Sequence, residues 1–192
     1  MSAFLVSFVL IFFAELGDKS QLVALWFATR YQWWLVITGV TSATLVVHLG
    51  STAVGASASD LLPEEVLLVI VGLSFFAFAA WSLRGDTMGE QERLLARSWS
   101  AALVLVTTAF FVSELGDKTQ LATISIAGSE DDFTGVWLGS TAGMVAADTL
   151  AIGAGVIAGR RLPERTMAVL SALLFTAFGT LALARAATLV VD

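Results

Sequence analysis

Six apolar runs dominate this 192-residue sequence and decide what it can fold into. Each has at least about the 20 residues that an α-helix needs to cross about 30 Å of hydrocarbon. Only 14% of the residues are charged, against about 25% in soluble domains. The sequence therefore predicts an all-α membrane protein with six transmembrane helices, roughly at 2–28, 33–57, 65–83, 99–127, 134–158 and 166–190. The first is expected to be a retained helix and not a signal peptide, because no basic region precedes it.

The two halves of the sequence repeat one another. The segment at 12–22 reads FFAELGDKSQL, and the segment at 110–121 reads FFVSELGDKTQL. Downstream of these segments, matched residues keep an offset of 100, as in Gly39 with Gly139, Gly55 with Gly155, and Phe75 with Phe175. A repeat of this length indicates a duplicated unit.

The repeat predicts two three-helix units, at 1–84 and 99–192, joined by a cytoplasmic linker at 85–98. Three spans are an odd number, so the second unit enters the membrane from the opposite face. Such inverted repeats are typical of secondary transporters.

The arginines predict the orientation. Seven of them fall on one side of the six-span arrangement, and only Arg185 falls on the other. Because basic residues favour the cytoplasmic side, we expect both termini outside the cytoplasm in a plasma (inner) membrane. The seven are Arg30, Arg84, Arg93, Arg97, Arg160, Arg161 and Arg165.

Each copy of the Glu-Leu-Gly-Asp-Lys motif places ionisable side chains near mid-span. Glu15, Asp18 and Lys19 lie about 20 Å along the first span at 1.5 Å per residue. On a continuous helix, positions i, i+3 and i+4 share one face, so we expect these three to point together into the bundle. Ionisable groups at this depth usually mark an ion or proton pathway. The second copy supplies Glu114, Asp117 and Lys118.

A structural role is the alternative for these motifs. A Glu-to-Lys bridge four residues apart stabilises any helix, and it would explain Glu15 with Lys19. It leaves Asp18 and Asp117 as surplus buried anions. Four carboxylates and two ammonium groups sum to −2, which matches a divalent cation.

The oxygen-rich side chains predict the kind of metal. Carboxylate, amide and hydroxyl oxygens suit Ca²⁺, Mn²⁺ or Mg²⁺, and the chain has no cysteine and only one histidine. We expect no permanently bound cofactor, only a transported cation. The predicted metal ligands are Glu15, Asp18, Gln21, Glu114, Asp117 and Gln120. The predicted supporting residues are Lys19, Ser20, Lys118 and Thr119.

The glycine within each Glu-Leu-Gly-Asp-Lys motif has two possible structural roles. Gly17 and Gly116 either break each helix in mid-membrane, which is tolerated where a cavity is lined, or allow close helix packing. Gly135, Gly139 and Gly143 recur every four residues, a spacing that predicts tight helix contact.

His48 and Asp148 occupy equivalent places in the second and fifth spans. A histidine side chain titrates near neutral pH, and a carboxylate can also hold a proton. Either residue is therefore a candidate for carrying a counter-transported proton. A buried, hydrogen-bonded residue without a transport role is the alternative for both.

Several function classes are disfavoured. The net charge of −6 and the absence of Lys/Arg-rich runs argue against nucleic acid as a partner. The sequence carries no nucleotide-binding loop and no His-Glu-x-x-His or Ser/Lys pattern, so ATP-driven transport and catalysis are not expected. The expected partners are the lipid bilayer, a divalent metal ion and protons. A homo-oligomer is possible, and the sequence does not decide the oligomeric state.

The paired motifs, Glu15 to Ser20 and Glu114 to Thr119, resemble those of the Gdt-type cation/proton exchangers, a family related to the lysine-exporter superfamily. The resemblance covers essentially the whole chain. It implies proton-coupled exchange of Ca²⁺ or Mn²⁺, with bacterial members looking mainly like manganese exporters. It also implies that Glu15, Asp18, Glu114 and Asp117 are cation ligands.

The leading hypothesis is a secondary transporter that exports a divalent cation in exchange for protons, and Mn²⁺ is the favoured candidate for that cation. The choice of Mn²⁺ over Ca²⁺ rests on the resemblance alone. The alternatives are a Ca²⁺/H⁺ antiporter and an amino-acid exporter of the lysine type, which the acidic motifs do not favour.

Overall fold

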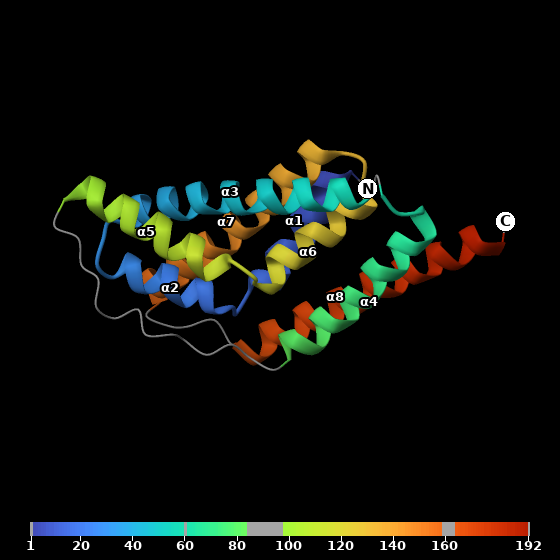
Figure 1. The fold of residues 1–192 in the computed structure, drawn as a ribbon. Coiled ribbons are helices and arrows are strands. Elements are labelled where there is room, and N and C mark those ends of the chain that lie inside the picture. The colour runs from blue at the N-terminus through green and yellow to red at the C-terminus, as the bar shows by residue number, and fades with distance from the viewer. Residues whose placement is uncertain (1, 60, 84–97, 159–163, 192) are drawn as a thin grey trace.

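The computed structural model describes residues 2–59, 61–83, 98–158 and 164–191 of the chain. Within those ranges the chain forms eight α-helices and no β-strand (Figure 1), which confirms the all-α prediction. The predicted linker lies outside the described residues except for Ser98, as do Arg84, Arg93, Arg97, Arg160 and Arg161. The helices are α1 (Ala3–Glu15), α2 (Lys19–Ala28), α3 (Trp33–Ser59), α4 (Glu64–Ser82), α5 (Trp99–Glu114), α6 (Lys118–Ser129), α7 (Phe133–Ala158) and α8 (Glu164–Val191).

The helices match the predicted apolar runs with one difference. The runs at 2–28 and 99–127 are each divided into two helices, α1 with α2 and α5 with α6, and the break falls inside the Glu-Leu-Gly-Asp-Lys motif. The other four runs correspond to α3, α4, α7 and α8. The helix-breaking interpretation of the motif glycines is thus confirmed.

Two helices of the described chain are long and apolar enough to cross a membrane, α3 over Trp33–Ala58 and α7 over Phe133–Gly153. The pair α5–α6 passes the same test as one span, bent by 69° at its break. These lengths support a multi-pass membrane protein. The arrangement of six spans stays a prediction.

The two long helices form the centre of the molecule. Helices α3 and α7 contact one another, α1 packs along α7, and both α5 and α6 pack on α3 (Figure 1). Large apolar side chains such as Phe27, Phe110 and Met144 are fully buried between them. The motif breaks therefore lie within a packed helical core.

Helix α7 approaches α1 through its glycines. A Cβ atom placed on Gly139 or Gly143 would clash with the backbone carbonyl oxygen of Phe4 or Phe8. The predicted tight contact is confirmed at these two positions, and the partner is α1. A Cβ on Gly135 would instead meet the Asp132 side chain, which accepts a hydrogen bond from the Gly135 N–H.

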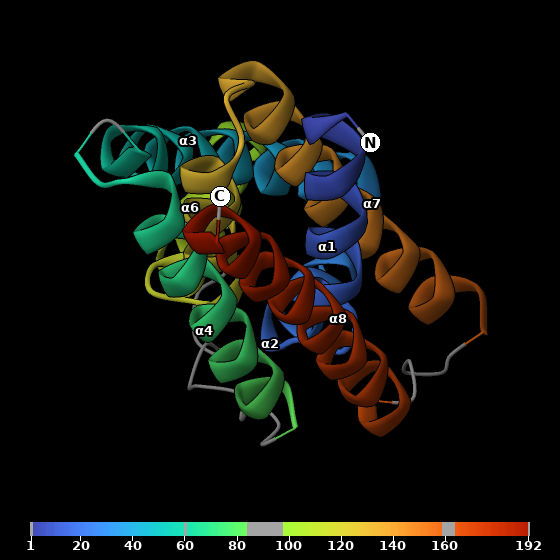
Figure 2. The same ribbon diagram turned by 90° about the vertical axis from the view of Figure 1, so that its right-hand side faces the viewer.

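Helices α4 and α8 form an antiparallel pair at one side of the molecule (Figures 1 and 2). Phe75 of α4 stacks on Phe175 of α8, with ring centroids 5.9 Å apart. Helix α4 also contacts α6, and α8 contacts α1. The outer face of α4 exposes Val66, Val69 and Leu73, as a lipid-facing surface does.

Candidate functional site

Both motifs fold into the same turn. Leu16 has φ −61° and ψ 120°, Gly17 has φ 81°, and the Asp18 N–H donates to the Glu15 carbonyl over 3.0 Å. This is the geometry of a type II β-turn, whose third residue needs a positive φ and is therefore usually glycine. The second motif repeats it, with φ −67° and ψ 118° at Leu115, φ 79° at Gly116 and a 3.2 Å bond from the Asp117 N–H to the Glu114 carbonyl.

The turn corrects one expectation about the motif. Asp18 and Asp117 lie beyond the ends of α1 and α5, not on a continuous helix. The shared helix face therefore does not explain how the acids of each motif come together. The β-turn does, because its hydrogen bond from the aspartate N–H to the glutamate carbonyl holds the two residues close together across the bend.

Each turn is closed by the motif glutamine. Gln21 Oε1 accepts a 2.8 Å hydrogen bond from the Gly17 N–H, and Gln120 Oε1 accepts a 2.6 Å bond from the Gly116 N–H. Gln21 Nε2 also donates to the Ala147 carbonyl of α7. The amide oxygens considered as metal ligands thus already hold the turns, a role that the repeated spacing of four residues from glycine to glutamine could have indicated.

Because Gly116 has a positive φ, we expect different substitutions at this position to destabilise the fold to different extents. A Cβ atom there would meet no heavy atom within 4 Å, so substitution costs only backbone strain, about 1–2 kcal/mol for an ordinary L-residue. We expect Gly116→Ala to lower the free energy of unfolding by about that amount, Gly116→Val by more, and Gly116→Asn by less, since asparagine tolerates this region. Unfolding in mixed detergent micelles measures the series, and equal losses in all three variants would contradict the turn.

The motif acids are buried together. Glu15, Asp18, Glu114 and Asp117 each expose 2% or less of their surface. The Ser20 hydroxyl donates to Glu15, and the Thr119 hydroxyl donates to Glu114 over 3.3 Å and to Asp117 over 3.5 Å. The acids whose charges act on Glu15 are Glu114, Asp148, Asp18 and Asp117.

An ion pair joins the two motifs. Lys118 Nζ, at the start of α6, lies 2.6 Å from Asp18 Oδ2 in the first turn, and both side chains are buried. Sequence reasoning considered lysine pairing only within one motif and missed this contact between them. The side chain of Lys19, the equivalent of Lys118, lies outside the described residues.

Asp148 belongs to the same group of buried acids. Asp148 of α7 is buried, and its charge acts on both Glu15 and Glu114. His48 of α3 is also buried, beside the backbone of Ser140. Five carboxylates, three from helices α1, α5 and α7 and two from the motif turns, therefore share one buried region.

Several carboxylate oxygens in this region have no hydrogen-bond partner among the described residues: Glu15 Oε2, Glu114 Oε1 and both oxygens of Asp148. Buried polar atoms are satisfied in the large majority of cases, so these oxygens suit a ligand, a proton or water. As the structure stands, no three acidic or histidine side chains in its described part converge closely enough to hold a metal ion.

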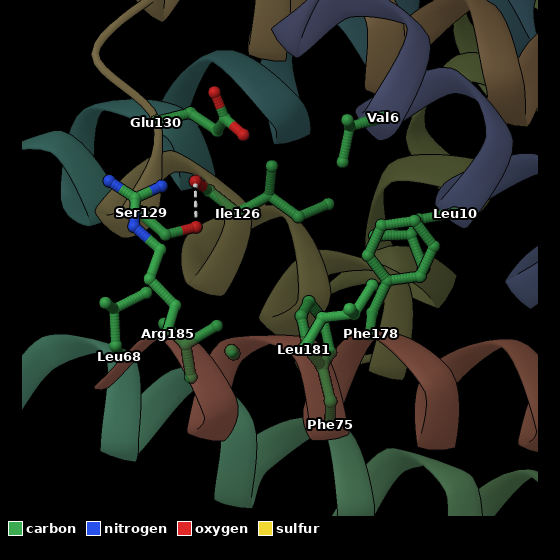
Figure 3. Close-up of a pocket in the computed structure, with 12 residues that line it drawn as sticks. Val6, Leu10, Leu68, Phe75, Ile126, Ser129, Glu130, Phe178, Leu181 and Arg185 are labelled. Atoms are coloured by element: carbon green, nitrogen blue, oxygen red, sulfur yellow. Dashed lines mark hydrogen bonds between the residues drawn. The ribbon is translucent and has the colours of Figure 1, made fainter. Parts of the chain in front are cut away.

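A separate pocket of about 190 Å³ lies between α1, α4, α6 and α8 (Figure 3). Val6, Leu10 and Phe75 contribute to its apolar wall, and Glu130 and Arg185 both lie on one side of it. The motif acids do not line it. It is therefore distinct from the acidic region.

Known proteins match this chain along most of its length. A family profile described as divalent cation/proton antiporter GDT1 matches residues 3–90 and again residues 102–189. A Vibrio cholerae protein named "Putative manganese exporter" is 33% identical over 166 residues, which cover 85% of this chain and 81% of that protein. GDT1-like protein 4 of Arabidopsis thaliana is 29% identical over 217 residues, which cover 93% of this chain and 94% of that protein.

A chloroplastic relative, GDT1-like protein 2 of Oryza sativa, is 30% identical over 207 residues, which cover 92% of this chain and 59% of that protein. No solved structure matches the chain. The family is one of cation/proton antiporters, which are transporters and not enzymes. The resemblance carried by the paired motifs is confirmed: this chain belongs to the divalent cation/proton antiporter GDT1 family.

Proposed function

We propose that this chain exports a divalent metal cation in exchange for protons, with Mn²⁺ as the preferred ion. One observation carries the proposal: the buried acids of both motifs lie together, and several of their oxygens lack a partner among the described residues. Ionisable groups within a membrane are energetically costly, and where they occur they usually mark an ion or proton pathway. Membership of a family of divalent cation/proton antiporters supports the same function.

The charge of the site favours a metal over an amino acid. Four motif carboxylates and two motif lysines leave −2, and Asp148 adds a further carboxylate beside them. An amino-acid substrate brings a carboxylate of its own, which this region would repel. Hard oxygen ligands suit both Mn²⁺ and Ca²⁺, so the order of preference rests on the name of the Vibrio cholerae relative, with a Ca²⁺/H⁺ antiporter as the alternative.

The direct ligands in this proposal are Glu15, Asp18, Glu114 and Asp117. Gln21 and Gln120 hold the two turns and so set the positions of these acids. Ser20 and Thr119 donate to the glutamates of their own motifs. Because no three acids converge on one point in the described residues, the ligands would draw together as the cation enters.

The proposal includes two inverted three-helix repeats, 1–84 and 99–192, in six spans with both termini outside the cytoplasm of an inner membrane. The double match of the family profile supports the repeat. So do contacts between equivalent residues: Thr44 donates to the sulfur of Met144 over 3.4 Å, and Phe75 stacks on Phe175. Equivalent residues meet in this way beside a two-fold axis that relates two antiparallel copies.

The test is flux into proteoliposomes that contain only the purified chain. Mn²⁺, Ca²⁺, Mg²⁺ and lysine are offered in parallel under the same imposed pH gradient, with protein-free vesicles as the control. We expect Mn²⁺ to move fastest, Ca²⁺ more slowly, and lysine at the protein-free rate. Faster Ca²⁺ than Mn²⁺ would favour the alternative ion, and lysine flux without metal flux would overturn the proposal.

A further inference from the structure

Lys118 lies where a transported cation would bind. Its Nζ is 2.6 Å from Asp18 Oδ2, a short distance typical of a charge-assisted hydrogen bond. Its charge also interacts with Glu15 and Asp117. The ammonium group of one motif therefore sits among acids of both motifs.

The ammonium group of Lys118 and a divalent metal ion cannot both lie beside Asp18 without a large electrostatic cost. A buried ammonium group and a divalent metal ion beside the same carboxylate repel one another strongly, because screening by water is weak there. The glutamates differ in this respect: Glu15 and Glu114 each accept a neutral hydroxyl hydrogen bond and keep one oxygen without a partner among the described residues. Among the described contacts, the ion pair of Lys118 is with Asp18, so competition by its positive charge is directed first at Asp18.

We infer that Lys118 is a tethered competitor of the transported cation, pairing with Asp18 when the site holds no metal and leaving it when metal binds. The inference rests on the proposed function. Return of the ammonium group to Asp18 then helps to expel the metal on the release side. Lys118 is a positioning residue that acts through Asp18, and it keeps metal affinity low enough for turnover.

This role predicts an effect of opposite sign to that of a structural ion pair. If Lys118 only held the two motifs together, its removal would disorder the acids and weaken metal binding. If it competes with the metal, its removal leaves the acids more negative and strengthens metal binding. The direction of the change in Kd separates the two.

The experiment titrates Mn²⁺ alone into the purified full chain in detergent, at one fixed pH, by isothermal titration calorimetry. Lys118→Met keeps the aliphatic stem and removes the charge, and Lys118→Arg keeps the charge. For Lys118→Met we expect the Kd for Mn²⁺ to fall about tenfold, equivalent to ~1.4 kcal/mol. In proteoliposomes the same variant should show a lower KM and a lower maximal exchange rate, because release slows. Lys118→Arg should keep a Kd close to that of the wild type.

Size-exclusion chromatography and the Tm without metal establish that each variant is folded, and Lys118→Gln replaces Lys118→Met if the latter does not fold. An unchanged or higher Kd in the folded neutral variant overturns the inference while leaving the proposed function intact. A wild-type chain that binds neither Mn²⁺ nor Ca²⁺ overturns the proposed function, and the inference with it.

Discussion

Replacing Asp18 by asparagine should abolish Mn²⁺ transport and leave the chain folded. The carboxylate is fully buried, pairs with Lys118 across the two motifs and lies among the other acids. Asparagine has nearly the same shape but no charge. Losing one of the four proposed carboxylate ligands should lower flux by about a hundredfold or more, equivalent to about 2.8 kcal/mol of lost cation-binding free energy. Asp117→Asn should behave in the same way, because the second motif folds into the same turn.

The fold should survive because Lys118 keeps other acids nearby. Glu15 and Asp117 both interact with it, so its charge stays compensated when Asp18 is neutral. Glu65→Gln is the matched control, since Glu65 lies half-exposed in the first turn of α4, and its flux should stay within about twofold of wild type. Proteoliposome flux and size-exclusion chromatography measure the two properties, and a wild-type rate in folded Asp18→Asn would refute the site.

Asp148→Asn should separate metal binding from proton movement. Asp148 is buried, its charge acts on Glu15 and Glu114, and both of its oxygens lack a hydrogen-bond partner among the described residues. An amide cannot take up and release a proton as a carboxyl group does. We therefore expect Mn²⁺ binding to persist while proton flux, followed by a pH dye inside the vesicles, falls to the protein-free rate.

Asp148→Glu is the control for this experiment, because it keeps a carboxyl group at the same position. It should retain measurable proton flux. Proton flux at the wild-type rate in Asp148→Asn would show that the coupling proton travels elsewhere, and His48 would then be the next residue to test. Loss of Mn²⁺ binding in the same variant would instead make Asp148 a ligand.

The sequence predicts the helices well because long apolar runs in a membrane leave few alternatives. It offers helix breaks at Gly17 and Gly116 as only one of two interpretations, because a glycine in an apolar run also permits close helix packing. The kind of turn was harder to foresee. A leucine before glycine is compatible with either a helix or a type II turn, and the capping by Gln21 and Gln120 favours the turn only once the backbone has left the helix.

Contacts between the two halves could not be predicted in the same way. The pair Lys118–Asp18 depends on how the first turn is positioned against the start of α6. That position follows from packing between helices, for example the approach of α7 to α1 at Gly139 and Gly143. The glycine spacing indicates that a close contact forms and says nothing about which helix provides it.

The most direct measurement records Mn²⁺ and proton flux together in the same proteoliposomes. With Mn²⁺ outside and no initial pH difference, we expect Mn²⁺ to enter as protons leave, so that the vesicle interior becomes alkaline. Both signals should disappear in Asp18→Asn. Mn²⁺ entry without a change in internal pH, or a pH change that persists in Asp18→Asn, would contradict cation/proton exchange at the paired motifs.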